Sequence, residues 1–238
     1  MSGDGAAASI RGLLTGRSEA HLAPWRDEAG ECRLHRAVVE PLRALRAAAA
    51  GAGICLCVAS GFRSFERQLG IWNAKARGER PVLDERGNPW DWSALDDRAR
   101  VYAILRWSAL PGASRHHWGT DFDVWDPLAA GPGYRLRLEP DEYRPGGPFA
   151  RLAAWLDRHL DPATGFARPY PGADGGVAGE PWHLSYLPLA RRYQRALRVE
   201  VLRDLLADAQ LELKSVVLAE LDEIHARFVA PPALHRPG

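Results

Sequence analysis

The segment PGASRHHWGTDFDVWD, residues 111–126, combines two histidines, three aspartates, two tryptophans and two glycines. A surface loop has no need of the tryptophans, and a strand in the core does not favour the carboxylates. A metal site at the end of a strand uses both, because histidine and carboxylate bind metals and the aromatic rings shape the wall around them. Residues 120–125 alternate between polar and apolar side chains, which is typical of a strand. We therefore expect a strand with a candidate metal site where it begins.

The rest of the chain supplies two further strands and several helices. Residues 54–60 (ICLCVAS) are a short apolar run that predicts a buried strand, and residues 180–186 (EPWHLSY) interleave apolar and polar side chains. Apolar spacing and capping residues predict helices over 31–50, 64–78, 93–110, 148–160 and most of the chain from 188 onward. Helices that lie mostly before and after a few strands indicate an α+β fold, with a small antiparallel sheet flanked by helices.

This pattern also suggests how the chain is divided. Residues 1–187 are expected to form the domain with the metal site, and residues 188–238 a C-terminal helical extension packed on it. The loops 77–92 and 126–147 contain proline and glycine, and the second is a candidate lid or substrate wall. The C-terminal helices carry apolar residues at helical spacing, which suits packing on the core and would also suit binding a partner.

The composition limits the classes of partner and compartment. The chain of 238 residues is 46% hydrophobic, which is enough to bury a core, and its net charge of +1 leaves no basic excess for nucleic acid or an anionic membrane. No apolar run reaches the roughly 18 residues needed to span a membrane. The first 24 residues lack the charged start and apolar core of a signal peptide, so we expect a cytoplasmic chain unless an export signal lies outside it.

The cysteines do not predict a disulfide framework. Cys32, Cys55 and Cys57 are an odd number, and the last two lie two positions apart on one face of an expected strand. That geometry is poor for a disulfide bond. All three are expected to be buried thiols, because free cysteine behaves as a small hydrophobic residue.

Two histidines and one carboxylate near the expected strands are candidate metal ligands. His116 and Asp123 lie seven positions apart, and His183 lies on the later strand. This donor set fits a catalytic zinc ion that keeps one position open for water, and Glu180, three residues before His183, is placed to take a proton from that water. Each residue alone also has a structural explanation. His116 could cap the preceding helix, Asp123 could bind a backbone amide, and His183 could be a hydrogen-bonded core histidine.

Three short motifs, in this order, resemble the zinc D-alanyl-D-alanine carboxypeptidase and D,D-dipeptidase family. They are SGFRS at 60–64 followed by Gln68, the pattern S-x-H-x-x-G-x-x-x-D at 114–123, and E-x-W-H at 180–183. The family shares a fold group with lysostaphin-type peptidases and the hedgehog amino-terminal domain. The resemblance covers about the middle half of the chain, and it implies a zinc peptidase.

The resemblance implies a role for each matched residue. His116, Asp123 and His183 would hold the zinc ion, and Glu180 would act as general base and then as acid toward the leaving amine. Arg63 would stabilise the developing oxyanion. Substrate binding would fall to Ser114, Gln68 and Trp182, although Ser114 could instead only bond the loop backbone and Trp182 could only pack.

Two positions near the motif need separate interpretation. The family usually has alanine where this chain has Asp121, which would face the same side of a strand as Asp123. Asp121 could orient a ligand histidine, compete as a ligand, or form a salt bridge with Arg115. The family motif uses the first histidine of the pair, so His117 is expected near the site without binding the metal, or exposed.

The sequence therefore predicts a zinc metallopeptidase that cleaves a peptide bond next to a D-amino acid. The favoured substrate is a peptidoglycan stem peptide ending in D-Ala-D-Ala, which would suit an enzyme of the cell envelope. A D,D-dipeptidase or an L,D-endopeptidase on the same material is the alternative, because the motifs do not separate these specificities. A metal-containing binding module without catalysis is the alternative of another class, and the presence of both Glu180 and Arg63 favours the enzyme.

Overall fold

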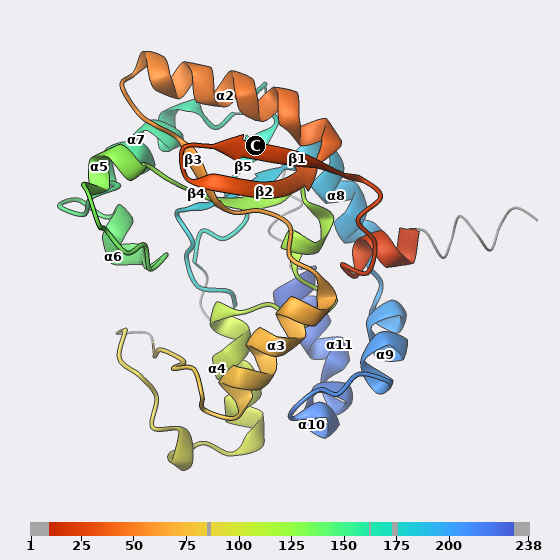
Figure 1. Cartoon of the computed structure of the whole chain (residues 1–238). Helices are drawn as coiled ribbons and strands as arrows, with labels where there is room; N and C mark the ends of the chain where they lie inside the picture. Colours follow the sequence, from red (N-terminus) through yellow and green to blue (C-terminus); the bar gives the residue numbers. More distant parts are fainter. Residues whose placement is uncertain (1–9, 85–86, 162, 173–175, 231–238) are drawn as a thin grey trace, which may run out of the picture.

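The computed structural model describes residues 10–84, 87–161, 163–172 and 176–230 and has the mixed α+β architecture that the sequence predicts (Figure 1). The first nine residues, on which the expectation about a signal peptide partly rests, lie outside this range. The strands are β1 Leu22–Asp27, β2 Gly30–His35, β3 Cys57–Ser60, β4 Asp121–Trp125, β5 Phe166–Ala167 and β6 His183–Tyr186. The main helices are α2 Val39–Gly51, α3 Phe65–Ala76, α4 Asp97–Trp107, α7 Ala150–His159, α8 Leu187–Ala196 and α9 Val199–Ala207.

The shorter helical segments lie between β2 and α2, in the two long loops, before β4 and after α9. They are η1 Arg36–Val38, η2 Trp92–Ala94, η3 Arg115–Trp118, α5 Pro127–Ala130, α6 Pro140–Tyr143, α10 Lys214–Ala219, α11 Leu221–Ile224 and η4 His225–Val229. Within the described residues, no helix is long and apolar enough to cross a membrane.

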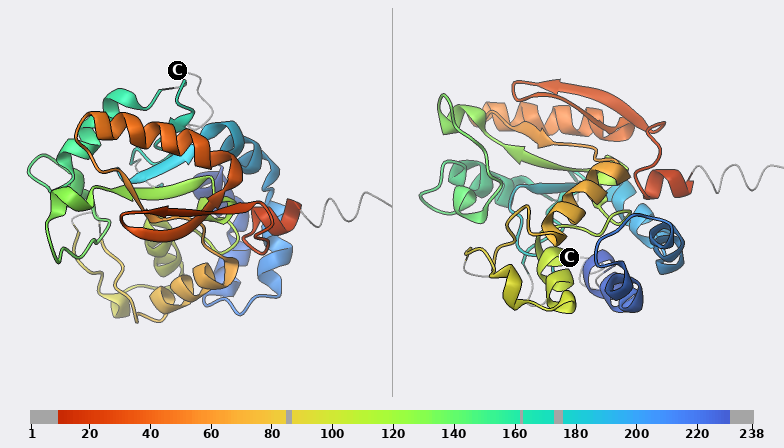
Figure 2. Two further views of the ribbon diagram at one scale, coloured as in Figure 1. Left: turned by 45° about the horizontal axis from the view of Figure 1, so that its top comes forward. Right: turned by 60° about the horizontal axis from the view of Figure 1, so that its bottom comes forward.

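A four-stranded antiparallel sheet, in the order β3-β4-β6-β5, organises the molecule. Side chains alternate between the two faces of a strand, so Phe122 and Val124 point to one face of β4 while Asp121 and Asp123 point to the other. The apolar face is covered by α2 and α7, which lie along the sheet in Figures 1 and 2. The polar face is left for the site.

A second apolar cluster lies on the other side of the site. Helices α3 and α4 share this cluster with α8, α9, α10 and α11 and with Trp118 from η3. Figure 1 shows α3, α4, α9, α10 and α11 below the sheet, while α8 lies beside it. The C-terminal helices thus share an apolar cluster with α3 and α4, and the division of the chain into two parts at residue 187 stays a prediction.

The structure corrects the expected elements near the amino end. Residues 31–35 belong to β2, which pairs with β1 in an antiparallel hairpin, and the helix begins only at Val39. Pro41 is the third residue of that helix and does not interrupt it, because the first-turn amides have no intrahelical partner. Gly51 is the last residue of the helix, one residue beyond the expected end.

Two other boundaries differ from the expected ones, and a third agrees. Helix α4 is capped by Asp96, whose side chain accepts from the Ala99 amide, so the helix does not start at Ser93. Strand β6 begins at His183, which leaves the preceding motif residues in a loop. Ser64 does cap α3, with its side chain accepting from the Arg67 amide.

The three thiols are free, but the expectation that all are buried is correct for only one of them. Cys57 is buried, whereas Cys32 and Cys55 are partly exposed. Cys55 and Cys57 lie close together at the start of β3, with 3.6 Å between their sulfur atoms.

Candidate active site

The three predicted ligands come together on the polar face of the sheet. Asp123 on β4 lies opposite His183 on β6 in the antiparallel register, and His116 is supplied by η3, just before β4. One donor atom from each of the three lies within 4.8 Å of the other two, and all three residues are buried. His116 Nε2 is 3.5 Å from Asp123 Oδ2, and His183 Nδ1 is 3.3 Å from Asp123 Oδ1.

Hydrogen bonds on the far side of each ring determine which nitrogen faces the cluster. His116 Nδ1 lies 2.9 Å from the Gly61 carbonyl oxygen, which can only accept, so Nδ1 carries the proton. His183 Nε2 lies 3.2 Å from Asp121 Oδ1 in the same way. When both rings are neutral, the inward nitrogens therefore direct lone pairs toward the Asp123 carboxylate. Three electron donors facing one another in this way fit a bound cation.

Asp121 orients one of the two histidines and is not part of the cluster itself. Arg115 Nε donates to Asp121 Oδ1 at 2.7 Å, and the Thr120 hydroxyl donates to Oδ2 at 2.7 Å. Burial acts to raise the pKa of Asp121, but Arg115 and His183 hold it well below its ordinary value. Two of the three roles considered for Asp121, orienting a histidine and pairing with Arg115, are present together.

The histidine pKa values reflect the charges around the cluster. Burial lowers the pKa of His116 to about 4, which keeps the ring neutral and able to donate its lone pair. Burial also acts to lower the pKa of His183, but the carboxylates of Asp121, Asp123 and Glu180 raise it well above its ordinary value. The negative charge around His183 thus favours a positive charge there, either a proton or a metal cation.

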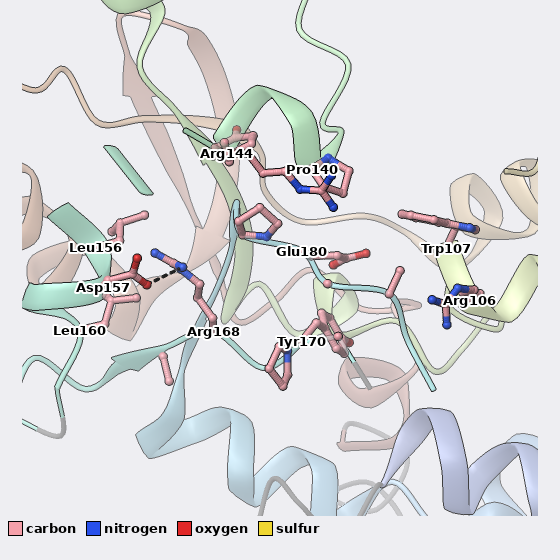
Figure 3. A pocket seen from close by; sticks show the side chains of 17 residues that line it. Arg106, Trp107, Pro140, Arg144, Leu156, Asp157, Leu160, Arg168, Tyr170 and Glu180 are labelled. Atoms are coloured by element: carbon pink, nitrogen blue, oxygen red, sulfur yellow. Dashed lines mark hydrogen bonds and ion pairs between the residues drawn. The ribbon is translucent and has the colours of Figure 1, made fainter. Parts of the chain in front are cut away.

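Glu180 lies beside the cluster without belonging to it. Its Oε2 is 3.2 Å from His183 Nδ1, and its side chain is 15% exposed, so the carboxylate reaches both the cluster and open space. Figure 3 shows the Glu180 side chain in the middle of a groove, between Pro140 on one side and Tyr170 on the other. This position suits a group that exchanges protons with a bound substrate.

Arg63 is held in place by contacts at both ends of the residue. Its Nη1 donates to Gln68 Oε1 at 2.9 Å, and its Nη2 lies 3.5 Å from the Ser60 hydroxyl. Its carbonyl oxygen lies 2.6 Å from His117 Nδ1. Burial lowers the pKa of the Arg63 guanidinium. The guanidinium still stays charged, because the ordinary pKa of arginine is far above neutral pH.

Comparison with known proteins identifies the family. A family model described as VanY, D-alanyl-D-alanine carboxypeptidase, matches residues 31–189. The chain belongs to this family. A curated relative, an uncharacterized protein of Haemophilus influenzae, is 35% identical over 122 residues, which is 50% of this chain and 92% of the relative.

Solved structures of VanY-type and related carboxypeptidases are also similar to the chain. The LdcB LD-carboxypeptidase matches with a TM-score of 0.51 at 19% identity, covering 84% of this chain and 78% of that one. A variant of the vancomycin resistance D,D-pentapeptidase VanY in complex with Zn(II) matches with a TM-score of 0.47 at 26% identity, covering 76% and 89%. The first of these supports a shared fold.

Of the three residues expected to bind substrate, two line the cavity at the cluster and one does not. Ser114 and Trp182 line the same cavity as the cluster, and Trp182 packs against Tyr143 with 5.5 Å between ring centroids. Gln68 is fully buried and does not line that cavity. Its oxygen accepts from Arg63, and its nitrogen donates to the Ala109 carbonyl at 2.7 Å. Contact between Gln68 and substrate stays a prediction, and in this structure its amide holds Arg63.

His117 proves to be buried rather than exposed. Its Nδ1 donates to the Arg63 carbonyl, and its Nε2 accepts from the Gly112 amide at 3.1 Å. Burial lowers its pKa to about 3, which keeps the ring in this neutral form. A side chain at Gly16, where φ is +75°, would overlap the ring, since a Cβ there would lie 2.3 Å from Nδ1. His117 thus fixes the main chain that carries Arg63.

The cavity of about 350 Å³ at the cluster includes residues that the motifs do not contain. Lys75 and Arg80 line it from the end of α3 and the following loop, and Tyr170 lies with its ring 4.9 Å from that of His183. Phe228 and Val229 line it from the far end of the chain. Helical spacing from Gln68 through Ile71 to Lys75 was the one sequence signal for this part of the wall.

The family resemblance implies that Arg63 stabilises the developing oxyanion, and on that expectation replacing it with lysine should lower kcat about 100- to 1000-fold. Lysine keeps the charge but cannot make the two-sided contact with Gln68 and Ser60 that fixes the guanidinium. Steady-state kinetics on the peptide substrate measure the effect. A change confined to KM would mean that Arg63 only holds the substrate.

Proposed function

We propose that this chain is a zinc D,D-carboxypeptidase that removes the terminal D-alanine from peptidoglycan stem peptides ending in D-Ala-D-Ala. The observation that carries the proposal is the convergence of His116, Asp123 and His183 beside Glu180, in a cavity that also contains Arg63. Family membership supports the same reaction.

Zinc is the metal that suits these donors. Two neutral imidazoles and one carboxylate, each imidazole with its other nitrogen bonded to an acceptor, are the ligand set of a catalytic zinc site. When bound there, zinc polarises a carbonyl and lowers the pKa of water toward 7. His116 Nε2, His183 Nδ1 and the Asp123 carboxylate would hold it.

The remaining steps belong to the chain's own side chains. Glu180 accepts a proton from the attacking water and then donates one to the amine of the departing D-alanine, and its partial exposure allows both transfers. Arg63 directs its guanidinium at the carbonyl oxygen and stabilises the negative charge that develops on it. The contacts of Arg63 with Gln68 and of its backbone with His117 are made before substrate binds, so little reorganisation is needed.

The shape of the cavity supports cleavage at the end of a peptide. Buried apolar residues, Leu105, Leu110 and Ala113, form part of its wall, which suits a small apolar side chain such as that of alanine. Two larger grooves also reach Glu180, and one is drawn in Figure 3. The body of a stem peptide would lie in such a groove, with its last residue in the cavity.

A comparison of two peptides tests the proposal. The zinc-loaded protein should release D-alanine from a pentapeptide stem with a free carboxyl end, and should act at least about 10-fold more slowly when that end is amidated, because carboxylate-binding groups would be left unpaired. Product identification by mass spectrometry measures both. Release of D-Ala-D-Ala would indicate a D,D-dipeptidase, and cleavage at an internal bond would indicate an endopeptidase. Metal binding without any cleavage would indicate a binding module.

A further inference from the structure

Lys75 lies on the wall of the catalytic cavity, and its ammonium has no anionic partner among the residues that the structure describes. It lies in the last turn of α3, and its ammonium donates to the Ser108 hydroxyl at 2.7 Å. Within the described part of the chain, no carboxylate lies within ion-pair distance of it. Burial lowers the pKa of Lys75 to about 8, and repulsion from Arg80 adds to this effect. Both burial and the repulsion from Arg80 destabilise the charged ammonium, and a bound anion would offset both effects.

The other cations of the cavity wall differ in how far they are neutralised. Arg115 is paired with Asp121, and Arg137 is paired with Glu139 and Asp141. Arg80 has no ion pair to any described carboxylate and lines the cavity beside Lys75. Arg63 likewise has only neutral side-chain partners among the described residues, Gln68 and Ser60, and both of these fix its guanidinium. Lys75 and Arg80 are therefore the cations on this wall that the described carboxylates leave unpaired and that have no other assigned role.

The surroundings of Lys75 match one kind of anion. Apolar residues of the cavity wall, Ile71, Leu105 and Leu110, accompany it, so the space accepts a small apolar group together with a negative charge. Lys75 lines the same cavity as Arg63, Glu180 and the His-Asp-His cluster. An amino acid with a short side chain and a free carboxylate has this chemistry.

We propose that Lys75, with Arg80 beside it, binds the terminal carboxylate of the residue that is released. This proposal rests on the proposed function, and it assigns the carboxylate contact that the matched motifs supply only through neutral Ser114 and Gln68. Ser108 orients the ammonium through its hydroxyl and leaves the remaining ammonium protons for the substrate. Lys75 is thus a specificity-determining residue that selects peptides with a free carboxyl end.

Replacing Lys75 with methionine tests this assignment, because methionine keeps the length and apolar stem but removes the charge. We expect KM for the peptide with a free carboxyl end to rise about 10- to 100-fold, the scale of one charge-assisted hydrogen bond, with little change in kcat. Turnover of the amidated peptide should not change, so the preference for a free end should largely disappear. Lys75→Arg should restore part of it.

Lys214→Met is the matched control, since Lys214 is the other lysine of the chain and bonds the Ala207 carbonyl away from the cavity. It should keep both the KM and the preference. Thermal unfolding of each variant shows whether Lys75→Met is folded. A folded Lys75→Met protein that keeps the preference for free ends would overturn the assignment.

A binding measurement separates this proposal from the proposed reaction. Calorimetric titration of D-Ala-D-Ala into the zinc-loaded Glu180→Gln protein, with and without Lys75→Met, needs no turnover. Binding that weakens about 10- to 100-fold in the double variant supports the role of Lys75. Equal binding refutes it even if the native protein is a carboxypeptidase. If the native protein cleaves neither peptide, the proposed function fails, and this titration alone decides whether Lys75 binds carboxylates.

Discussion

Replacing Glu180 with glutamine should lower kcat about 100- to 10,000-fold while the protein stays folded and keeps its metal. Glutamine has the same shape but cannot accept a proton from water, and loss of a positioned acid–base group costs this much. Glu180 lies outside the cluster of three donors, so the ligands are unchanged. Steady-state kinetics and metal analysis on the same preparation measure the two effects.

A matched glutamate serves as control for this variant. Glu79 is exposed and paired with Arg77, and it lines none of the cavities that reach Glu180. Glu79→Gln should therefore have native kinetics. Near-native turnover of Glu180→Gln would remove Glu180 from the mechanism, and loss of metal from it would mean that Glu180 is a ligand.

Replacing His116 or His183 with alanine should remove the metal and the activity together. The native protein should carry about one zinc per chain, the usual content of a site with three protein ligands. Each alanine variant leaves only two of the three converging donors, so zinc content after dialysis should fall close to zero and turnover to background. Atomic emission spectroscopy on dialysed protein measures the metal directly.

His117→Ala is the control that the chain itself provides for these variants. His117 is adjacent to His116 in the sequence, but its ring bonds the Arg63 carbonyl and the Gly112 amide and not the cluster. It should keep its zinc, and its turnover should fall because the backbone of Arg63 loses its support. Full zinc occupancy in both the His116 and His183 variants would contradict the ligand assignment.

The central strands and the His-Asp-His cluster could be predicted from the sequence. A strand alternates its side chains, so Asp121 and Asp123 had to share the face opposite Phe122. The hairpin of β1 and β2 was missed because Leu34, Ala37 and Val38 fit helical spacing, although they belong to a strand and a short helix. Whether such a segment forms a strand or a helix depends on whether it pairs with a neighbouring strand. The spacing of apolar residues within the segment does not reveal that pairing.

The cavity wall was not predictable in the same way. Lys75 and Arg80 belong to no matched motif, and their exposure to the site depends on how α3 packs against α4 through Ser108. The use of Gln68 as a support for Arg63 also appears only when both ends of its amide are seen to be bonded. The residues that would select the substrate are thus brought to the cavity by contacts between segments far apart in the sequence, and a sequence pattern does not show such contacts.

The position of Phe228 and Val229 on the cavity wall has a consequence for inhibitors. The family model ends its match at residue 189, so these two side chains come from a part of the chain outside it. A compound that engages only the His-Asp-His cluster would have little reason to distinguish this protein from other family members. One that extends to Phe228 and Val229 would contact a surface specific to chains with these C-terminal helices, and could be made selective there.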